Sequence, residues 1–134
     1  MTQNSDENSE MNSFLPPTAI GFVGLGNMGY PMAKRLAAAG YVLTVFDLAS
    51  DVVTQFCQET EATAAESLEA LGQSSSVVIT MLPDGKAVRK VLLGGGDNVV
   101  AGLKAGAVLL DMSSCSPVNT RLLSSELVKK GFPM

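Results

Sequence analysis

The feature that most constrains this 134-residue chain is a group of three glycines, Gly24, Gly26 and Gly29. An apolar segment at residues 18–23 precedes them, and a pattern of helical period begins before the last of them. The spacing G-x-G-x-x-G after an apolar segment predicts a strand that ends in a tight turn and leads directly into a helix.

Each of these glycines is predicted to meet a different requirement. Gly24 permits the turn, Gly26 lets a diphosphate approach the backbone, and Gly29 lets the helix pack close to the strand. The start of the helix then presents free N–H groups and a positive dipole end to the phosphates. The spacing alone is weak evidence for a nucleotide site, because glycines also form turns that bind no ligand.

An acidic residue strengthens the nucleotide hypothesis. A second apolar segment, residues 41–46, ends at Asp47, eighteen positions after Gly29. A carboxylate at this place accepts hydrogen bonds from the hydroxyls of an adenosine ribose and repels a 2′-phosphate, so it favours NAD over NADP. The alternative is that Asp47 only caps or turns the chain before the next helix.

The rest of the chain alternates apolar segments with segments of helical period. We predict strands at residues 18–23, 41–46, 62–64, 76–82 and 106–111. We predict helices at residues 27–39, after Ser50 as N-cap, at 65–71, at 86–93 and from Pro117 onward. Such alternation through short connections predicts an α/β fold, a doubly wound parallel sheet with helices on both faces.

Three local expectations accompany these ranges. Met28, Met32 and Leu36 share one face of the first helix and should pack against the sheet. Gly40 should end that helix. Residues 94–98 should form a flexible surface turn and not a phosphate loop, since no Lys-Ser/Thr pair follows the glycines.

The predicted sheet brings distant segments together. In doubly wound sheets, ligands bind at the carboxyl ends of the strands, where the strand order reverses. Residues 24–29, Asp47, residues 81–84 and residues 111–116 all fall at that edge. We therefore expect one crevice built from four loops, within a dinucleotide-binding domain that covers residues 18–134.

Composition narrows the classes of partner. The chain has 9 Lys and Arg against 13 Asp and Glu, a net charge of −4, and its first 17 residues are polar and acidic. Without a basic cluster to neutralise phosphates, we expect no nucleic-acid partner. We expect residues 1–17 to be a disordered acidic tail, and no apolar segment is long enough to span a membrane.

Metal and disulfide chemistry are not expected. The chain has no histidine, and Cys57 and Cys115 fall on separate predicted elements. This pattern is typical of reduced thiols in a cytoplasmic protein without a structural metal. The N-terminus lacks the features of a secretory signal and of a mitochondrial presequence.

Three motifs together resemble the β-hydroxyacid dehydrogenase family. In chain order they are GFVGLGNMGYPMA at residues 21–33, MLP at residues 81–83 and DMSSCSP at residues 111–117. Within that family the chain is most similar to the N-terminal domain of 3-hydroxyisobutyrate dehydrogenases and tartronate semialdehyde reductases, over about residues 19–132. The resemblance implies a Rossmann-type domain that binds NAD, with NADP the less expected cofactor.

The resemblance also implies roles for individual residues. The glycine segment would hold the diphosphate, Asp47 the adenosine ribose, and Leu82 and Pro83 would lie along the cofactor. Ser114 would stand beside the nicotinamide ribose, and Ser113 beside the substrate pocket. The complete set expected to bind the cofactor is Gly24, Leu25, Gly26, Asn27, Met28, Gly29, Asp47, Met81, Leu82, Pro83 and Ser114.

In that family, hydride passes between a nicotinamide cofactor and a small 3-hydroxy acid or its semialdehyde. The family's substrate-binding Ser-Gly-Gly, its proton-transfer lysine and its all-helical second domain would lie beyond Met134. We therefore expect no catalytic residue in this chain, which should bind a cofactor without turning over. We expect a form with the second domain to be a homo-oligomer that binds the hydroxy acid through that second domain.

The sequence departs from the family at Arg35, usually Asn, and at Ala87, where one hydrogen bond to the cofactor would be lost. Two other functions stay open. One is a non-catalytic dinucleotide sensor or interaction module. The other is part of an NADP enzyme of the imine reductase or glyoxylate reductase type. Against this second alternative, Leu48 follows Asp47 where those enzymes usually carry an Asn-Arg-Ser/Thr run.

Overall fold

A computed structural model describes residues 18–112 of the chain. Its strands are β1 (Ala19–Val23), β2 (Val42–Phe46), β3 (Thr63–Ala64), β4 (Val77–Thr80) and β5 (Val108–Asp111). Its helices are α2 (Gly29–Ala38), α3 (Ser50–Glu59), α4 (Leu68–Ser74) and α5 (Gly85–Leu93), with a short 3-10 helix, η1 (Val100–Gly102). The predicted alternation of strands and helices is confirmed.

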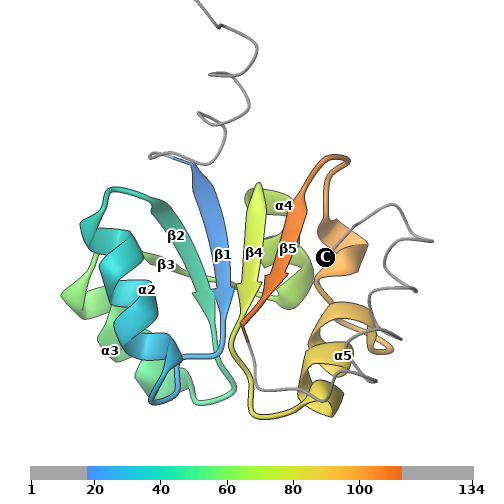
Figure 1. The fold of residues 1–134 in the computed structure, drawn as a ribbon, viewed down its shortest axis with the longest axis horizontal. Coiled ribbons are helices and arrows are strands. Elements are labelled where there is room, and N and C mark those ends of the chain that lie inside the picture. The colour runs from blue at the N-terminus through green and yellow to red at the C-terminus, as the bar shows by residue number, and fades with distance from the viewer. Residues whose placement is uncertain (1–17, 113–134) are drawn as a thin grey trace, which may run out of the picture.

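The five strands form one parallel sheet in the order β3-β2-β1-β4-β5 (Figure 1). Phe22 in the central strand β1 pairs with Val45 of β2 on one side and with Ile79 of β4 on the other. The chain runs outward from β1 to β3, then crosses to β4 and runs outward again. The order therefore reverses next to β1, as the predicted doubly wound fold requires.

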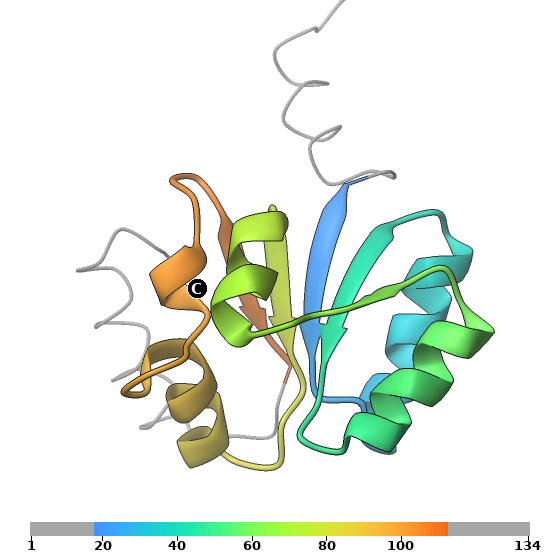
Figure 2. The same cartoon turned by 180° about the vertical axis from the view of Figure 1, so that it is seen from behind.

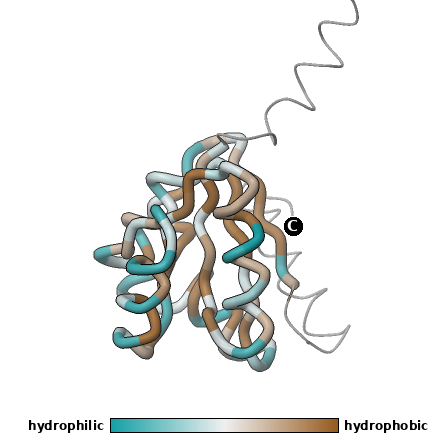
Figure 3. The backbone as a smooth tube through the Cα atoms, turned by 90° about the vertical axis from the view of Figure 1, so that its left-hand side faces the viewer, coloured by the Kyte–Doolittle hydropathy of each residue, from teal (hydrophilic) through white to brown (hydrophobic). Residues whose placement is uncertain are grey.

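Helices cover both faces of the sheet. Helix α2 lies in front of the sheet in Figure 1, whereas α4 lies in front of it in the opposite view of Figure 2. Each face has its own apolar core, one containing Phe22 with Phe56 of α3, the other containing Val78 with Leu71 of α4. The hydrophobic stretches run through the middle of the molecule in Figure 3 because strands buried on both faces have apolar side chains on both.

Several predicted boundaries shift. The helix expected at residues 65–71 begins instead at Leu68, because Ser67 takes the N-cap position and its hydroxyl accepts a hydrogen bond from the Ala70 N–H (3.0 Å). Ser50, the expected N-cap of the next helix, is its first helical residue, and Ala49 takes the N-cap position. Gly40 lies one residue after the C-cap of α2 with φ +100°, which suits a glycine that ends a helix.

The expectation that the methionines of α2 face the sheet is wrong for Met28. Its side chain is 70% exposed, and it precedes the helix as the N-cap residue. The buried residues of α2 are Gly29 and Ala33, whose small size lets the helix approach the sheet closely. Met32 and Leu36 contact the core only from its edge, because they are partly buried.

Several predictions fall outside the described residues. They concern the tail at residues 1–17, Ser113, Ser114, Cys115 and the helix from Pro117. Within residues 18–112, no helix is long and apolar enough to cross a membrane. The same part of the chain contains no group of His, Cys, Asp and Glu that could hold a metal ion.

Candidate functional site

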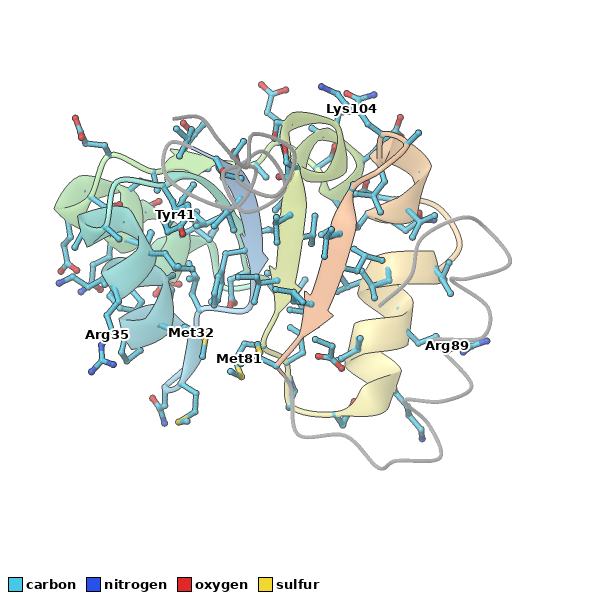
Figure 4. The ribbon with its side chains drawn as sticks, turned by 45° about the horizontal axis from the view of Figure 1, so that its top comes forward. Met32, Arg35, Tyr41, Met81, Arg89 and Lys104 are labelled. Atoms are coloured by element: carbon cyan, nitrogen blue, oxygen red, sulfur yellow. The ribbon has the colours of Figure 1, made fainter. Side chains whose placement is uncertain are left out.

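The candidate site lies at the edge of the sheet where β1, β2 and β4 end. Figure 4 shows Met32 and Met81 at this edge, while Lys104 lies at the opposite end of the molecule. Gly24 begins the turn after β1, and its N–H donates to the Phe46 carbonyl of β2 (3.0 Å). The Met81 N–H donates to the Val23 carbonyl (2.9 Å), so the three strand ends are held together by backbone hydrogen bonds.

The three glycines of the first loop have different surroundings. Gly24 has φ +105°, and a Cβ added there would collide with the Met81 carbonyl. A Cβ at Gly29 would collide with the Gly24 carbonyl and lie 3.3 Å from the Phe22 ring. A Cβ at Gly26 would meet nothing within 4 Å among residues 18–112, apart from its two chain neighbours. Packing inside the described chain therefore requires a small residue at Gly24 and Gly29, but not at Gly26.

The N-terminus of α2 opens at this loop without a cap from a side chain. Its N-cap residue, Met28, makes no side-chain hydrogen bond to the helix, and the first turn contains no acidic residue. The first N–H groups of a helix have no partner within the helix and carry partial positive charge. One of them, the Tyr30 N–H, donates to the Gly26 carbonyl (2.9 Å). The start of α2 therefore lies beside Gly26, where the described residues leave room for a ligand to approach.

Asp47 joins the end of β2 to the glycine loop. Its Oδ2 accepts a hydrogen bond from the Leu25 N–H (2.7 Å), and its Oδ1 accepts one from the Ala49 N–H (2.9 Å). The second bond is the turn interaction that the alternative interpretation of Asp47 expected. The carboxylate still has a free lone pair on each oxygen, so a turn function and a ribose contact are compatible.

Two connected hollows surround Asp47. The first, which we call the rim groove, has a volume of about 460 Å³ and is lined by Gly24, Gly26, Asn27, Met28, Gly29, Asp47, Met81, Leu82 and Pro83. Of the predicted cofactor residues among residues 18–112, the structure brings all except Leu25 to this groove. The Leu25 side chain is instead buried in the core, at 3% exposure, and its N–H is bound to Asp47.

The second hollow, which we call the side pocket, has a volume of about 420 Å³ and lies between the end of β2 and the start of α5. It shares Gly24, Asp47, Leu82 and Pro83 with the rim groove. Its own lining is mainly apolar and includes Leu48, which is 94% exposed, and Ala87. Together the two hollows form a path across the strand ends that suits an elongated ligand with an apolar part.

Residues 94–98, predicted only as a flexible turn, contribute to the side pocket. Gly95 and Asp97 line it, and the Asp97 carboxylate accepts hydrogen bonds from the Leu68 N–H (2.8 Å) and the Glu69 N–H (2.9 Å) of α4. Sequence reasoning missed Asp97 because the residues it caps lie 28 and 29 positions earlier in the chain. The one local indication was a carboxylate directly after a run of glycines.

The side pocket also contains a positive charge, because Lys90 of α5 lines it together with Asp47 and Asp97. Helix α5 itself is capped by Asp84, whose carboxylate accepts a hydrogen bond from the Ala87 N–H (2.9 Å). The wall formed by α5 is therefore fixed at its N-terminus by the chain's own carboxylate. This differs from α2, whose N-terminus faces the rim groove without a side-chain cap.

Comparison with known proteins agrees with this geometry. Residues 19–134 match the family described as the NAD binding domain of 6-phosphogluconate dehydrogenase. The chain is 40% identical over 116 residues to 3-sulfolactaldehyde reductase of Escherichia coli (strain K12), covering 87% of this chain and 38% of that protein. It is 35% identical over 119 residues to mitochondrial 3-hydroxyisobutyrate dehydrogenase of Mus musculus, covering 89% of this chain and 35% of that protein.

A solved structure shows the same likeness. Mycobacterium tuberculosis 3-hydroxyisobutyrate dehydrogenase with L-serine superposes with a TM-score of 0.79 and 31% sequence identity, over 87% of this chain and 38% of that one. The resemblance predicted from the three motifs is confirmed. In each comparison the chain spans well under half the length of the protein that it matches.

Proposed function

Because the chain belongs to the family of NAD binding domains of 6-phosphogluconate dehydrogenase, we propose that it is the cofactor-binding part of an oxidoreductase that acts on a small 3-hydroxy acid or its semialdehyde. The substrate class follows from the relatives, which are named as a 3-sulfolactaldehyde reductase and 3-hydroxyisobutyrate dehydrogenases. The cofactor would supply or accept the hydride, and this part of the protein would bind and orient it.

The observation that carries the proposal is the open space at Gly26 beside the side-chain-uncapped start of α2. Neither turn geometry nor packing within residues 18–112 explains a glycine there, since an added Cβ meets nothing within 4 Å. A diphosphate in the rim groove explains it, because backbone N–H groups bind phosphate only where no side chain keeps the anion away.

The positions proposed for the other parts of the cofactor follow from the course of the two hollows across the strand ends. Asp47 lies where the two hollows join, so its carboxylate would accept hydrogen bonds from the adenosine ribose. The adenine ring would enter the side pocket between Leu48 and Ala87. The nicotinamide half would leave the rim groove on the side of Met81, where β4 ends beside β5.

We further propose that the cofactor is NAD rather than NADP. A 2′-phosphate on the ribose would place its charge close to the Asp47 carboxylate. The next residue, Leu48, offers no cation to compensate, and its side chain is almost fully exposed. Lys90 is the cation that lines the side pocket, and it belongs to the wall formed by α5 and not to the end of β2.

Calorimetric titration of the 134-residue chain with NAD and with NADP at moderate salt tests the cofactor, and an assay with 3-hydroxyisobutyrate and tartronate semialdehyde tests turnover. We expect binding of NAD, weaker binding of NADP and no turnover by this chain alone. Binding of neither dinucleotide would contradict the proposal. Preference for NADP would favour the imine reductase or glyoxylate reductase alternative, and turnover would contradict the expectation that the proton-transfer residue lies elsewhere.

A further inference from the structure

Few of the described residues that line the side pocket are charged, so each charged side chain restricts which ligand atoms can lie beside it. Apart from Asp47 at its junction with the rim groove, the charged side chains that line it are Lys90 and Asp97. Most of the remaining lining is apolar, including Leu48, Leu68 and Val91. A flat ring fits such a lining, and its edge would meet one of the charged groups.

Asp97 is held in place by the protein itself. Its two carboxylate oxygens accept one hydrogen bond each, from the N–H groups of Leu68 and Glu69 at the start of α4. Each ionised oxygen has a second lone pair, so the group can accept two more hydrogen bonds and can donate none. The wall around Asp97 therefore suits a hydrogen-bond donor and disfavours an acceptor.

The adenine end of a dinucleotide presents such a donor. Its exocyclic amino group carries two N–H bonds, whereas the ribose hydroxyls would be bound by Asp47 at the mouth of the pocket. We propose that Asp97 selects the base of the cofactor by accepting a hydrogen bond from the adenine amino group. This inference rests on the proposed function, because it assumes that the adenosine half occupies the side pocket.

The competing explanation is that Asp97 only caps α4. A second residue at the same helix end makes this alternative testable, since the Ser67 hydroxyl accepts a hydrogen bond from the Ala70 N–H (3.0 Å). Ser67 is not part of the side-pocket lining. Replacing Ser67 loosens the same helix end without removing an acceptor from the pocket, so Ser67→Ala is the matched control.

The test compares NAD with nicotinamide hypoxanthine dinucleotide by calorimetry on the full 134-residue chain. The second compound differs only in its base, where a carbonyl oxygen replaces the amino group and N1 gains a hydrogen. We expect the unaltered chain to bind NAD about tenfold more tightly, because the carbonyl oxygen would face a carboxylate that cannot donate. Asp97→Ala should bring this ratio close to one, while Ser67→Ala should leave it unchanged.

Asp97→Asn provides a second variant if the alanine variant unfolds. Its amide keeps an acceptor for α4 and can donate to the hypoxanthine carbonyl, so the ratio should fall or reverse. Equal affinity of the unaltered chain for both dinucleotides would overturn base selection and leave the proposed function intact. Tighter binding of the hypoxanthine compound would overturn it in favour of contact with Lys90. Failure of both compounds and NADP to bind would overturn the proposed function and this inference together.

Discussion

Helices α2 and α4 both begin at the edge of the sheet where the strands end, but their N-termini differ. The start of α4 is closed by its own chain, through the Ser67 hydroxyl and the Asp97 carboxylate. The start of α2 has neither a side-chain cap nor an acidic residue in its first turn. The Tyr30 N–H at this end donates to the Gly26 carbonyl (2.9 Å) and to no side chain. Because the start of a helix attracts negative charge, this difference supports the proposal that α2, and not α4, faces the diphosphate.

The glycines show the same division. Gly72 and Gly102 bring α4 and η1 into close contact. A Cβ at Gly72 would collide with the carbonyl of Val99, the N-cap residue of η1, and a Cβ at Gly102 with the Glu69 carbonyl of α4. Gly29 has the same function between α2 and the first loop. Gly26 differs from all three, because an added Cβ would meet no other part of the described chain within 4 Å. The room at Gly26 is what the diphosphate proposed for the rim groove requires.

The largest predicted effect is on stability, at Gly29. Gly29→Ala places a methyl group against the Gly24 carbonyl and near the Phe22 ring, and the backbone on that side cannot move away easily. Helix propensity favours alanine by about 1 kcal/mol, but overpacking against backbone should outweigh it and lower the free energy of unfolding by about 3 kcal/mol. Urea denaturation measures the loss, with Gly26→Ala as the control. Similar stability of the two variants would contradict the packing difference between the glycines.

The next effect is on binding, at Gly26. Gly26→Val fills the open space beside the start of α2, so we expect NAD affinity to fall at least about a hundredfold. The thermal midpoint should change little, because among residues 18–112 no atom beyond the two chain neighbours lies within 4 Å of the added Cβ. Calorimetry gives the affinity and a thermal melt gives the control. Retained affinity in a folded variant would remove the diphosphate from the rim groove.

A smaller effect is expected on cofactor preference. Asp47→Asn with Leu48→Arg removes the repelling charge and supplies a cation for a 2′-phosphate, so the ratio of NADP to NAD affinity should rise by about tenfold. Asp47→Asn alone separates the loss of repulsion from the gain of attraction. If neither variant alters the ratio, Asp47 acts only through its hydrogen bonds to Leu25 and Ala49.

These residues also show what sequence could predict. The first loop could be predicted because Gly24, Gly29 and the turn they form lie within a few positions of one another, and apolar segments of known period flank them. The position of Asp47 could be predicted because this residue comes directly after the end of a predicted strand. Both predictions depend on short-range geometry, and the doubly wound parallel sheet then follows from the alternation of elements.

Interactions between residues far apart in the chain could not be predicted in this way. Asp97 caps residues 28 and 29 positions away, and the close approach of Gly72 to the Val99 carbonyl joins elements that periodicity treats separately. Met28 was assigned to the buried face because helical spacing was extended one residue before the helix begins. The roles of the predicted cofactor residues, Ser113 and Ser114 included, remain predictions that the binding experiments address.

The closed end of α4 makes a prediction of intermediate size. Asp97→Ala removes the carboxylate that accepts from two N–H groups of α4, and we expect a loss of about 1 kcal/mol in the free energy of unfolding, as for other N-caps. Ser67→Ala should cost a similar amount. Urea denaturation of both variants measures these losses. If Asp97→Ala leaves the stability unchanged, α4 is closed by Ser67 alone, and the contrast with α2 weakens.

The smallest predicted effect concerns the side-chain contact between the first turns of α2 and the end of α3. The Glu59 carboxylate on α3 accepts hydrogen bonds from the Tyr30 hydroxyl (2.6 Å) and the Gln55 amide (3.2 Å), and its Oε1 lies 3.4 Å from the Lys34 ammonium. The Tyr30 hydrogen bond is the main cause that lowers the pKa of Glu59 below its ordinary value of 4.5, and the same bond raises the pKa of Tyr30 to about 12. A carboxyl group with a lowered pKa stabilises the fold above its ordinary pKa, and this contribution is lost as the pH falls through the lowered value.

Glu59→Gln should therefore reduce the fall in urea midpoint between about pH 6 and about pH 3, and the change should be small because these side chains lie at the surface. Glu61→Gln controls for the loss of one negative charge. Parallel acid profiles for the unaltered chain and Glu59→Gln would show that the Tyr30 contact adds nothing to stability. At neutral pH, Glu59→Gln should leave NAD affinity unchanged, because the contact uses the side chains of Tyr30 and Lys34 whereas the diphosphate is proposed to bind backbone N–H groups. A loss of affinity would mean that cofactor binding at the start of α2 depends on the attachment of α2 to α3.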